Sequence, residues 1–287
     1  LIVIREILKE SQTNIPDFLD ENIFYLGKSY NLLCSNKKNG ILFNGNFEDS
    51  NKEFDNYLTF HKYKFKDDAN EAGGYVLLRN KQSLLTIDVG KAPDKKFSKD
   101  YQAGLFSFEF EFLGEKVITN SGYFQDYKHQ LNLISKSSAT HSTLVLDDTS
   151  TVRFERDKYG HMLANKNFKI INKEIKNDKN FWLVRASHDA FSKSNGVIHE
   201  RQLNYYHNNY KLEGTDKLIK TKNFKSCNFA IRFHLLPEIN LTKLINNETI
   251  LIESKNSGWK FTCKNHKIDI ETGLYFGMKN KYIENKN

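Results

Sequence analysis

Histidine and arginine recur in pairs, two residues apart, in segments rich in aromatic and β-branched residues. His199 and Arg201 form one pair, and Arg232 and His234 form the other. Because side chains alternate between the two faces of a strand, the members of each pair are expected to share a face. Together with His188 they would form a polar wall that binds carboxylate or sulfate groups. An ordinary solvent-facing strand explains any single pair better, so only the recurrence of the pattern favours a binding wall.

After about residue 70, where these side chains lie, the apolar residues recur with a period of two. Phe106, Phe108, Phe110 and Phe112 alternate with polar residues and predict the clearest strand. Further short strands are predicted at Ser142–Leu146, Val152–Glu155, Phe168–Ile171, Phe181–Ala186, Val197–Leu203, Phe229–Leu236, Thr249–Ile252 and Trp259–Cys263. Many short strands without interposed helices predict a mainly β protein, with an antiparallel β-sandwich over residues 70–287.

The first 62 residues predict helices instead. Leu19, Ile23, Leu26, Tyr30 and Leu33 recur at spacings of four and three, which places them on one helical face. The segment at residues 1–9 and the segment around residues 54–58 are expected to form two more helices. Because these helices have no second layer of their own, we expect this segment to belong to a larger helical domain.

The composition excludes several classes of protein. Hydrophobic residues make up 39% of the 287 residues and aromatic residues 13%, which argues against disorder. The longest apolar runs fall far short of the roughly 18 residues needed to span a bilayer. The net charge of +8 attracts polyanions, although a Lys-rich surface that only contacts water explains it as well. Three widely spaced cysteines suggest neither a disulfide framework nor a zinc knuckle.

Several blocks resemble the C-terminal region of the heparinase II/III-like family. They are Ala103–Phe110, Thr119–Gly122, Ala139–Asp148, Ser187–Asp189, Gly196–Arg201, Leu212–Gly214 and Ile231–His234, in the family's order. The similarity covers most of residues 73–274. The helical start resembles the end of the (α/α) toroid that precedes the sandwich in these proteins.

This resemblance implies a polysaccharide lyase that acts by β-elimination on uronate-containing chains such as glycosaminoglycans. It also implies export, to the periplasm or cell envelope. In the family the toroid contributes a Tyr and an Asn or His to the site. Those positions would lie mainly upstream of Leu1, so the chain is expected to be part of a longer protein.

The sandwich half of the family site is altered in this sequence. Asp100 occupies the position of the family's catalytic His, while Gln102, Asn120 and His141 occupy the positions of its zinc ligands. Since amides are poor zinc ligands, we predict no bound zinc, no other cofactor, and a hydrogen-bonded polar cluster in its place. Asp100 and Tyr101 are the candidates to replace the lost acid or base, and His141 completes the catalytic set. Asn120 would bind the substrate.

Two functions remain open at this stage. The chain is either a lyase homologue whose sandwich forms one wall of a cleft for an acidic polysaccharide, or a noncatalytic sandwich that binds a glycan or envelope polymer. Nucleic acid is not expected as a partner, because no stacking or groove-reading motif accompanies the lysines. The sequence does not specify an oligomeric state.

Overall fold

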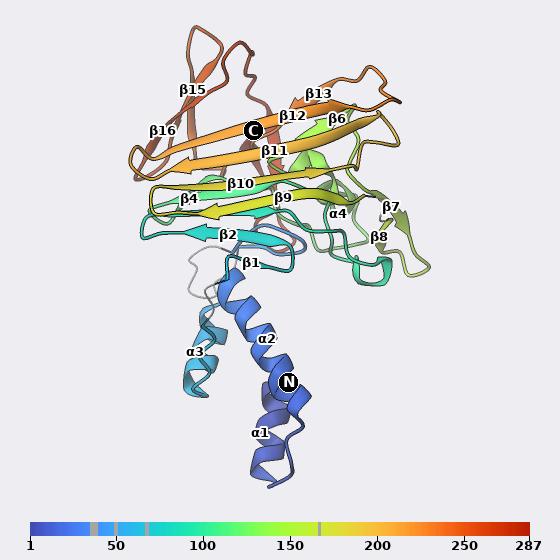
Figure 1. Cartoon of the computed structure of the whole chain (residues 1–287), viewed down its shortest axis with the longest axis vertical. Coiled ribbons are helices and arrows are strands. Elements are labelled where there is room, and N and C mark those ends of the chain that lie inside the picture. The colour runs from blue at the N-terminus through green and yellow to red at the C-terminus, as the bar shows by residue number, and fades with distance from the viewer. Residues whose placement is uncertain (35–39, 49–50, 67–68, 166–167) are drawn as a thin grey trace. The chain divides into compact units, whose positions relative to one another are not determined.

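The computed structural model describes residues 1–34, 40–48, 51–66, 69–165 and 168–287 (Figure 1). The chain forms two compact units, one made of Leu1–Gly40 and Asp49–Gly73, the other of Ile41–Glu48 and Gly74–Asn287. Within the described ranges, no helix has both the length and the apolar character needed to cross a membrane.

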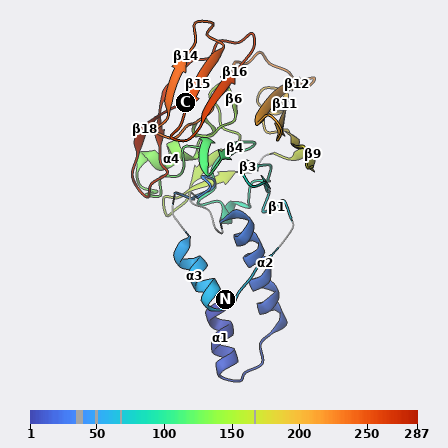
Figure 2. The ribbon, with the colours of Figure 1, turned by 90° about the vertical axis from the view of Figure 1, so that its left-hand side faces the viewer.

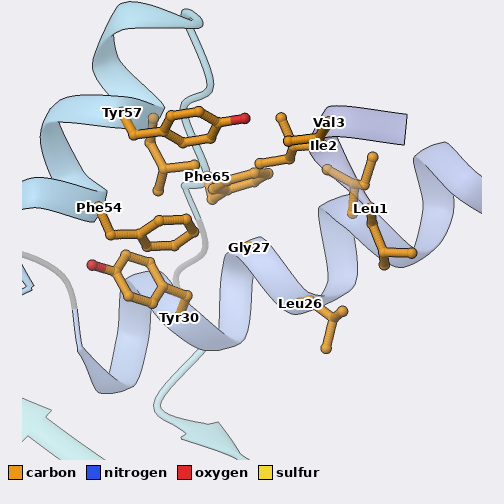
Figure 3. Close-up of a pocket in the computed structure, with 11 residues that line it drawn as sticks. Leu1, Ile2, Val3, Leu26, Gly27, Tyr30, Phe54, Tyr57 and Phe65 are labelled. Carbon is orange, nitrogen blue, oxygen red and sulfur yellow. The ribbon is translucent and has the colours of Figure 1, made fainter. Parts of the chain in front are cut away.

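The first unit is helical, as the sequence predicts. Its helices are α1 (Ile2–Glu10), α2 (Asp17–Leu33) and α3 (Lys52–Phe60), and its last element is the short strand β1 (Glu71–Ala72). Leu19 and Ile23 on α2 are buried together with residues of α3 and the segment that follows it, as their predicted stripe requires. Leu26 from the same stripe is 53% exposed and lines an apolar pocket with Tyr30 and Phe54 (Figure 3). This unit therefore presents apolar surface that its own helices do not cover.

The second unit is an antiparallel β-sandwich, which confirms the predicted fold class. One sheet contains neighbouring strands in the order β2 (Tyr75–Arg79), β3 (Ser83–Asp88), β4 (Phe108–Phe112) and β5 (Glu115–Ile118). The other has the order β12 (Lys211–Lys220), β11 (Val197–Tyr206), β10 (Phe181–His188) and β9 (Ile170–Asn177). One buried core joins the two sheets, and in it the ring of Phe110 on β4 lies 5.1 Å from that of Tyr205 on β11.

Smaller elements complete this unit (Figure 2). The remaining paired strands are β6 (Leu144–Leu146) with β13 (Phe229–Ile231), β7 (Arg153–Arg156) with β8 (Met162–Asn165), β14 (Asn240–Lys243) with β15 (Thr249–Glu253) and β16 (Gly258–Thr262), and β17 (Thr272–Tyr275) with β18 (Ile283–Lys286). The one α-helix described in this unit is α4 (Gln130–Lys136), and short 3₁₀ turns lie at Lys95–Phe97 and Ser138–Thr140.

Two strand predictions need correction. The strand predicted from Phe106 begins at Phe108, because Phe106 has a positive φ of 60° that does not fit a strand. On the polar side of that strand, Glu109 is buried and pairs with buried Lys116 at 3.1 Å. The strand predicted over 229–236 ends at Ile231, and His234 instead forms an isolated bridge with Thr119.

Candidate functional site around Asp100

Four polar residues form a compact group, here called the Asp100 cluster: Asp100, Tyr123, Asn132 and Lys136. The Tyr123 hydroxyl donates a hydrogen bond to Asp100 Oδ1 at 3.2 Å and accepts one from Asn132 Nδ2 at 3.0 Å. Lys136 Nζ lies 5.3 Å from the centre of the Tyr123 ring. Asp100 is exposed, whereas the other three residues are buried. The cluster therefore connects one solvent-facing carboxylate to a buried phenol.

Burial sets the protonation of Tyr123 and Lys136. It raises the pKa of Tyr123 above its usual range, and the Asp100 charge adds to the effect, so the phenol stays neutral. Burial also lowers the pKa of Lys136 to about 8, against the opposing pull of Asp100. Lys136 Nζ donates to the carbonyl oxygens of Tyr101, at 3.0 Å, and of Lys99. A fixed positive charge thus lies beside a neutral proton donor.

Helix α4 positions two members of the cluster. Its N-terminus is capped by His129, whose Nδ1 accepts the backbone N–H of Leu131 at 3.2 Å. Asn132 and Lys136 are four residues apart, so they lie on the same helical face. Asn132 also donates to the carbonyl of Phe124 at 2.6 Å, which holds its amide in place.

The segment Ile41–Glu48 packs against Asp100 and Gln102. Asn44 Oδ1 accepts the backbone N–H of Gln102 at 2.7 Å, and the backbone N–H of Gly45 donates to Gln102 Oε1 at 3.3 Å. A Cβ at Gly45, where φ is +85°, would lie 2.7 Å from the Cβ of Asp100. Glycine is therefore needed for this close approach.

Two of the three positions that the resemblance assigns to zinc ligands hold buried, hydrogen-bonded amides, Gln102 and Asn120. Gln102 Nε2 donates to the carbonyls of Gly122 at 2.9 Å and Ser135 at 2.6 Å, and Asn120 Oδ1 accepts the backbone N–H of Ser142 at 2.9 Å. The described ranges contain no group of three His, Cys, Asp or Glu side chains that could hold a metal ion. The residues at these positions therefore do not fit the zinc that the resemblance implies. The absence of bound zinc remains a prediction.

His141 and Tyr101 lie in the interior, which argues against direct catalytic roles. His141 donates from Nδ1 to the carbonyl of Ser137 at 2.8 Å, and burial lowers its pKa to about 4. Its Nε2 has no hydrogen-bond partner among the described residues. Tyr101 is 6% exposed within the sandwich core, where burial raises its pKa well above the usual value. Of the predicted catalytic set, only Asp100 reaches solvent.

His188, His199 and Arg201 form a buried network rather than the predicted open wall. His199 and Arg201 do share a face of β11, but that face points into the sandwich. His188 Nε2 lies 3.1 Å from His199 Nδ1, and His199 Nε2 lies 2.6 Å from Asp216 Oδ1. The backbone N–H of Ala190 donates to His188 Nδ1, so each histidine donates from Nε2 towards Asp216.

Arg201 links this network to the opposite layer. Its Nε and Nη2 bind Asp216 at 2.8 and 2.9 Å, and its Nη1 donates to the carbonyls of Phe106 and Ser142. Burial alone would raise the pKa of Asp216, but Arg201 and His199 hold it well below its usual range. Burial lowers the pKa values of both histidines. The network therefore holds the sandwich together, and its side chains do not face solvent.

Arg232 and His234 do not line a common wall. His234 is buried between Ser121 Oγ, 3.0 Å from its Nδ1, and the carbonyl of Ala139, 3.0 Å from its Nε2. Burial lowers the pKa of His234 to about 3. Arg232 is partly exposed, and its Nη2 lies 3.8 Å from Glu271. The fold thus separates the environments of the two residues that the strand pattern joined.

No pattern in the sequence indicated most of the Asp100 cluster. Tyr123 directly follows a block that carries the family resemblance, so the resemblance pointed to this part of the chain. It did not indicate the contact between Tyr123 and Asp100. Helix α4, which carries Asn132 and Lys136, was not predicted. Asp88 was also missed, and burial raises the pKa of this carboxyl to about 7.

Solved polysaccharide lyases have the same fold as this chain. Heparan sulfate lyase HepC from Pedobacter heparinus matches with a TM-score of 0.73 at 12% identity, over 95% of this chain and 44% of that one. The heparinase III BT4657 gene product matches with a TM-score of 0.74 at 13% identity, over 95% and 44%. A further heparinase III structure matches with a TM-score of 0.69 at 14% identity, over 98% and 48%. The chain therefore spans less than half the length of these lyases.

The sequence comparison identifies the family. The family model named heparinase II/III-like, C-terminal, matches residues 65–286. The chain therefore belongs to the heparinase II/III-like family, as the sequence blocks predict. No curated protein matches the sequence.

Proposed function

We propose that this protein is a polysaccharide lyase that cleaves a uronate-containing acidic polysaccharide by β-elimination. The family match over residues 65–286 is the observation that carries the proposal. In this proposal the sandwich forms one wall of the substrate cleft, and the helices of the first unit are the end of an (α/α) toroid. The apolar surface on those helices supports a further helical layer. The net charge of +8 suits an anionic substrate.

The Asp100 cluster supplies a proton donor for this reaction. In β-elimination a base removes the C5 proton, the C4–O bond breaks as the C4–C5 double bond forms, and the leaving oxygen must gain a proton. Tyr123 is buried, so its proton passes along the hydrogen bond to Asp100, and Asp100, the exposed member, gives it to that oxygen. The phenolate then regains a proton through Asp100, the member that contacts solvent. The base that takes the C5 proton comes from the toroid in this scheme.

Lys136 stabilises the charge that this transfer creates. Its ammonium group lies over the Tyr123 ring, fixed by two backbone carbonyls, so it needs no rearrangement when the phenolate forms. Gln102 and His141 are buried and act as positioning residues for the Asp100 cluster. Gln102 joins the segment at Gly45 to the carbonyls of Gly122 and Ser135.

The test is lyase activity of the full-length protein. Heparan sulfate and other uronate polymers are incubated with the protein, and the ultraviolet absorbance of the unsaturated sugar is followed. We expect Asp100→Asn to lower kcat about 100-fold. Asp94→Asn, an exposed carboxylate outside the cluster, is the control and should leave kcat unchanged. An absorbance increase that Asp100→Asn does not affect would exclude the assigned role.

The burial of Tyr101 and His141 favours a second candidate, a noncatalytic glycan-binding sandwich. Such a protein would retain acidic glycans in affinity electrophoresis without producing the absorbance of the unsaturated sugar. The same preparations therefore separate the two functions.

A further inference from the structure

Aromatic and cationic side chains from three separate segments meet beside Asp100. Lys99 immediately precedes Asp100, Tyr127 and Lys128 lie just before α4, and the turn between β7 and β8 contributes Lys158, Tyr159 and His161 (Figure 1). These six residues are here called the tyrosine–lysine surface. Neither the sequence pattern nor the proposed proton transfer uses them.

The rings of this surface form a connected row. The Tyr127 and His161 rings are 4.4 Å apart, and the His161 and Tyr159 rings are 6.5 Å apart. Tyr159 is 67% exposed, so much of its ring contacts solvent. The row therefore offers aromatic faces to a ligand from solvent.

The turn that presents Tyr159 is held by its own hydrogen bonds. Asp157 Oδ1 accepts the backbone N–H groups of Tyr159 at 2.9 Å and His161 at 2.8 Å. Arg156 Nη1 donates to the carbonyl of Gly160 at 3.0 Å, and Gly160 has a φ of +91° that favours glycine. Because the turn is fixed before binding, a ligand loses little free energy in ordering it.

Lysines lie along the same row. Lys99 Nζ is 5.7 Å and Lys128 Nζ 5.9 Å from the centre of the Tyr127 ring, and Lys158 Nζ is 4.9 Å from that of Tyr159. Asp126 Oδ1 accepts the backbone N–H of Lys128 at 3.0 Å, and Asp157 holds the turn and lies 3.3 Å from His161 Nδ1. Neither carboxylate forms a salt bridge with these lysines. The surface thus combines aromatic rings with lysine ammonium groups that form no salt bridge in the described ranges.

A sugar ring that carries sulfate or carboxylate groups has the complementary pattern. Its face presents C–H groups that pack on an aromatic ring, and its edge presents anions that lysine ammonium groups bind. We propose that the tyrosine–lysine surface is a binding subsite for an anionic sugar of the polysaccharide chain, next to Asp100. This inference rests on the proposed function and names the part of the sandwich that holds the chain beside the reacting bond. Single-stranded nucleic acid also binds stacked aromatic residues with lysines, but the family membership favours the saccharide.

Affinity electrophoresis of the full-length protein in gels containing heparan sulfate tests the proposal. We expect Tyr159→Ala and Lys158→Ala each to weaken retention about fivefold. Tyr282→Ala and Lys260→Ala, exposed residues outside the surface, are the matched controls and should leave retention unchanged. In the activity assay, Tyr159→Ala should raise KM with kcat unchanged, since it alters binding and not proton transfer.

Other outcomes would overturn the proposal in distinguishable ways. If heparan sulfate retains the wild type and both variants equally, the subsite is wrong while the proposed function stands. If no acidic glycan retains the wild type and none is cleaved, the proposed function fails and the subsite with it. If single-stranded DNA retains the protein more strongly than heparan sulfate and Tyr159→Ala abolishes that retention, the surface binds nucleic acid instead.

Discussion

Acidification should destabilise the sandwich through its buried histidines, and His234 gives the clearest measure. Burial lowers its pKa to about 3, whereas an unfolded histidine titrates near 6.5. The folded state therefore binds fewer protons than the unfolded state below pH 6.5. The penalty on the fold grows as the pH falls from about 6.5 towards 3, and it is absent above this window.

The expected size follows from these two pKa values. At pH 5 an unfolded histidine is almost fully protonated, while His234 in the fold is neutral. Because pH 5 lies about 1.5 units below the pKa of the unfolded histidine, the unfolding free energy falls by about 2 kcal/mol. Asp88 opposes this loss, because its raised pKa of about 7 makes the fold take up a proton as the pH falls. The effect of His234 is therefore measured as the difference between the wild type and a variant that lacks this histidine, and not from the pH dependence of the wild type alone.

The perturbation is His234→Gln, whose amide can still donate to the carbonyl of Ala139. Urea unfolding is followed at pH 7 and pH 5 by fluorescence of buried Trp182. Between these two values the variant should lose about 2 kcal/mol less than the wild type. His266→Gln, at an exposed histidine, is the control and should match the wild type. A variant whose loss equals that of the wild type would refute the reasoning, since burial would then not set the protonation of His234.

Three further predictions test the site and its support. Tyr123→Phe should lower kcat about 100-fold with little change in KM, measured by steady-state absorbance kinetics, and an unchanged kcat would remove Tyr123 from its role. Asp216→Asn leaves the Arg201 charge buried without its partner and should lower the unfolding free energy by about 3–5 kcal/mol in urea at pH 7; a loss below about 1 kcal/mol would contradict the network. Metal analysis of the purified protein should find no stoichiometric zinc, because the Gln102 amide donates to backbone carbonyls. One zinc per chain that is lost on His141→Ala would show that these residues do bind zinc.

Local patterns in the sequence determined the classes of element and the family. The helical spacing from Leu19 to Leu33 predicts α2, and the alternation through Phe108, Phe110 and Phe112 predicts β4. These patterns succeed because each helix or strand must place its apolar residues at the period of its own backbone. The blocks around Ala103–Phe110 and Ala139–Asp148 sufficed to indicate the heparinase II/III-like family.

Only the tertiary structure decided which polar side chains face solvent. Alternation puts His199 and Arg201 on one face of β11, but whether that face is open depends on the second sheet and on Phe106, far away in the sequence. Asp100 meets Tyr123 across 23 residues, and Gln102 meets Asn44 across 58. Contacts of this kind depend on how distant segments pack, because period two marks the two sides of a strand without specifying what covers either of them.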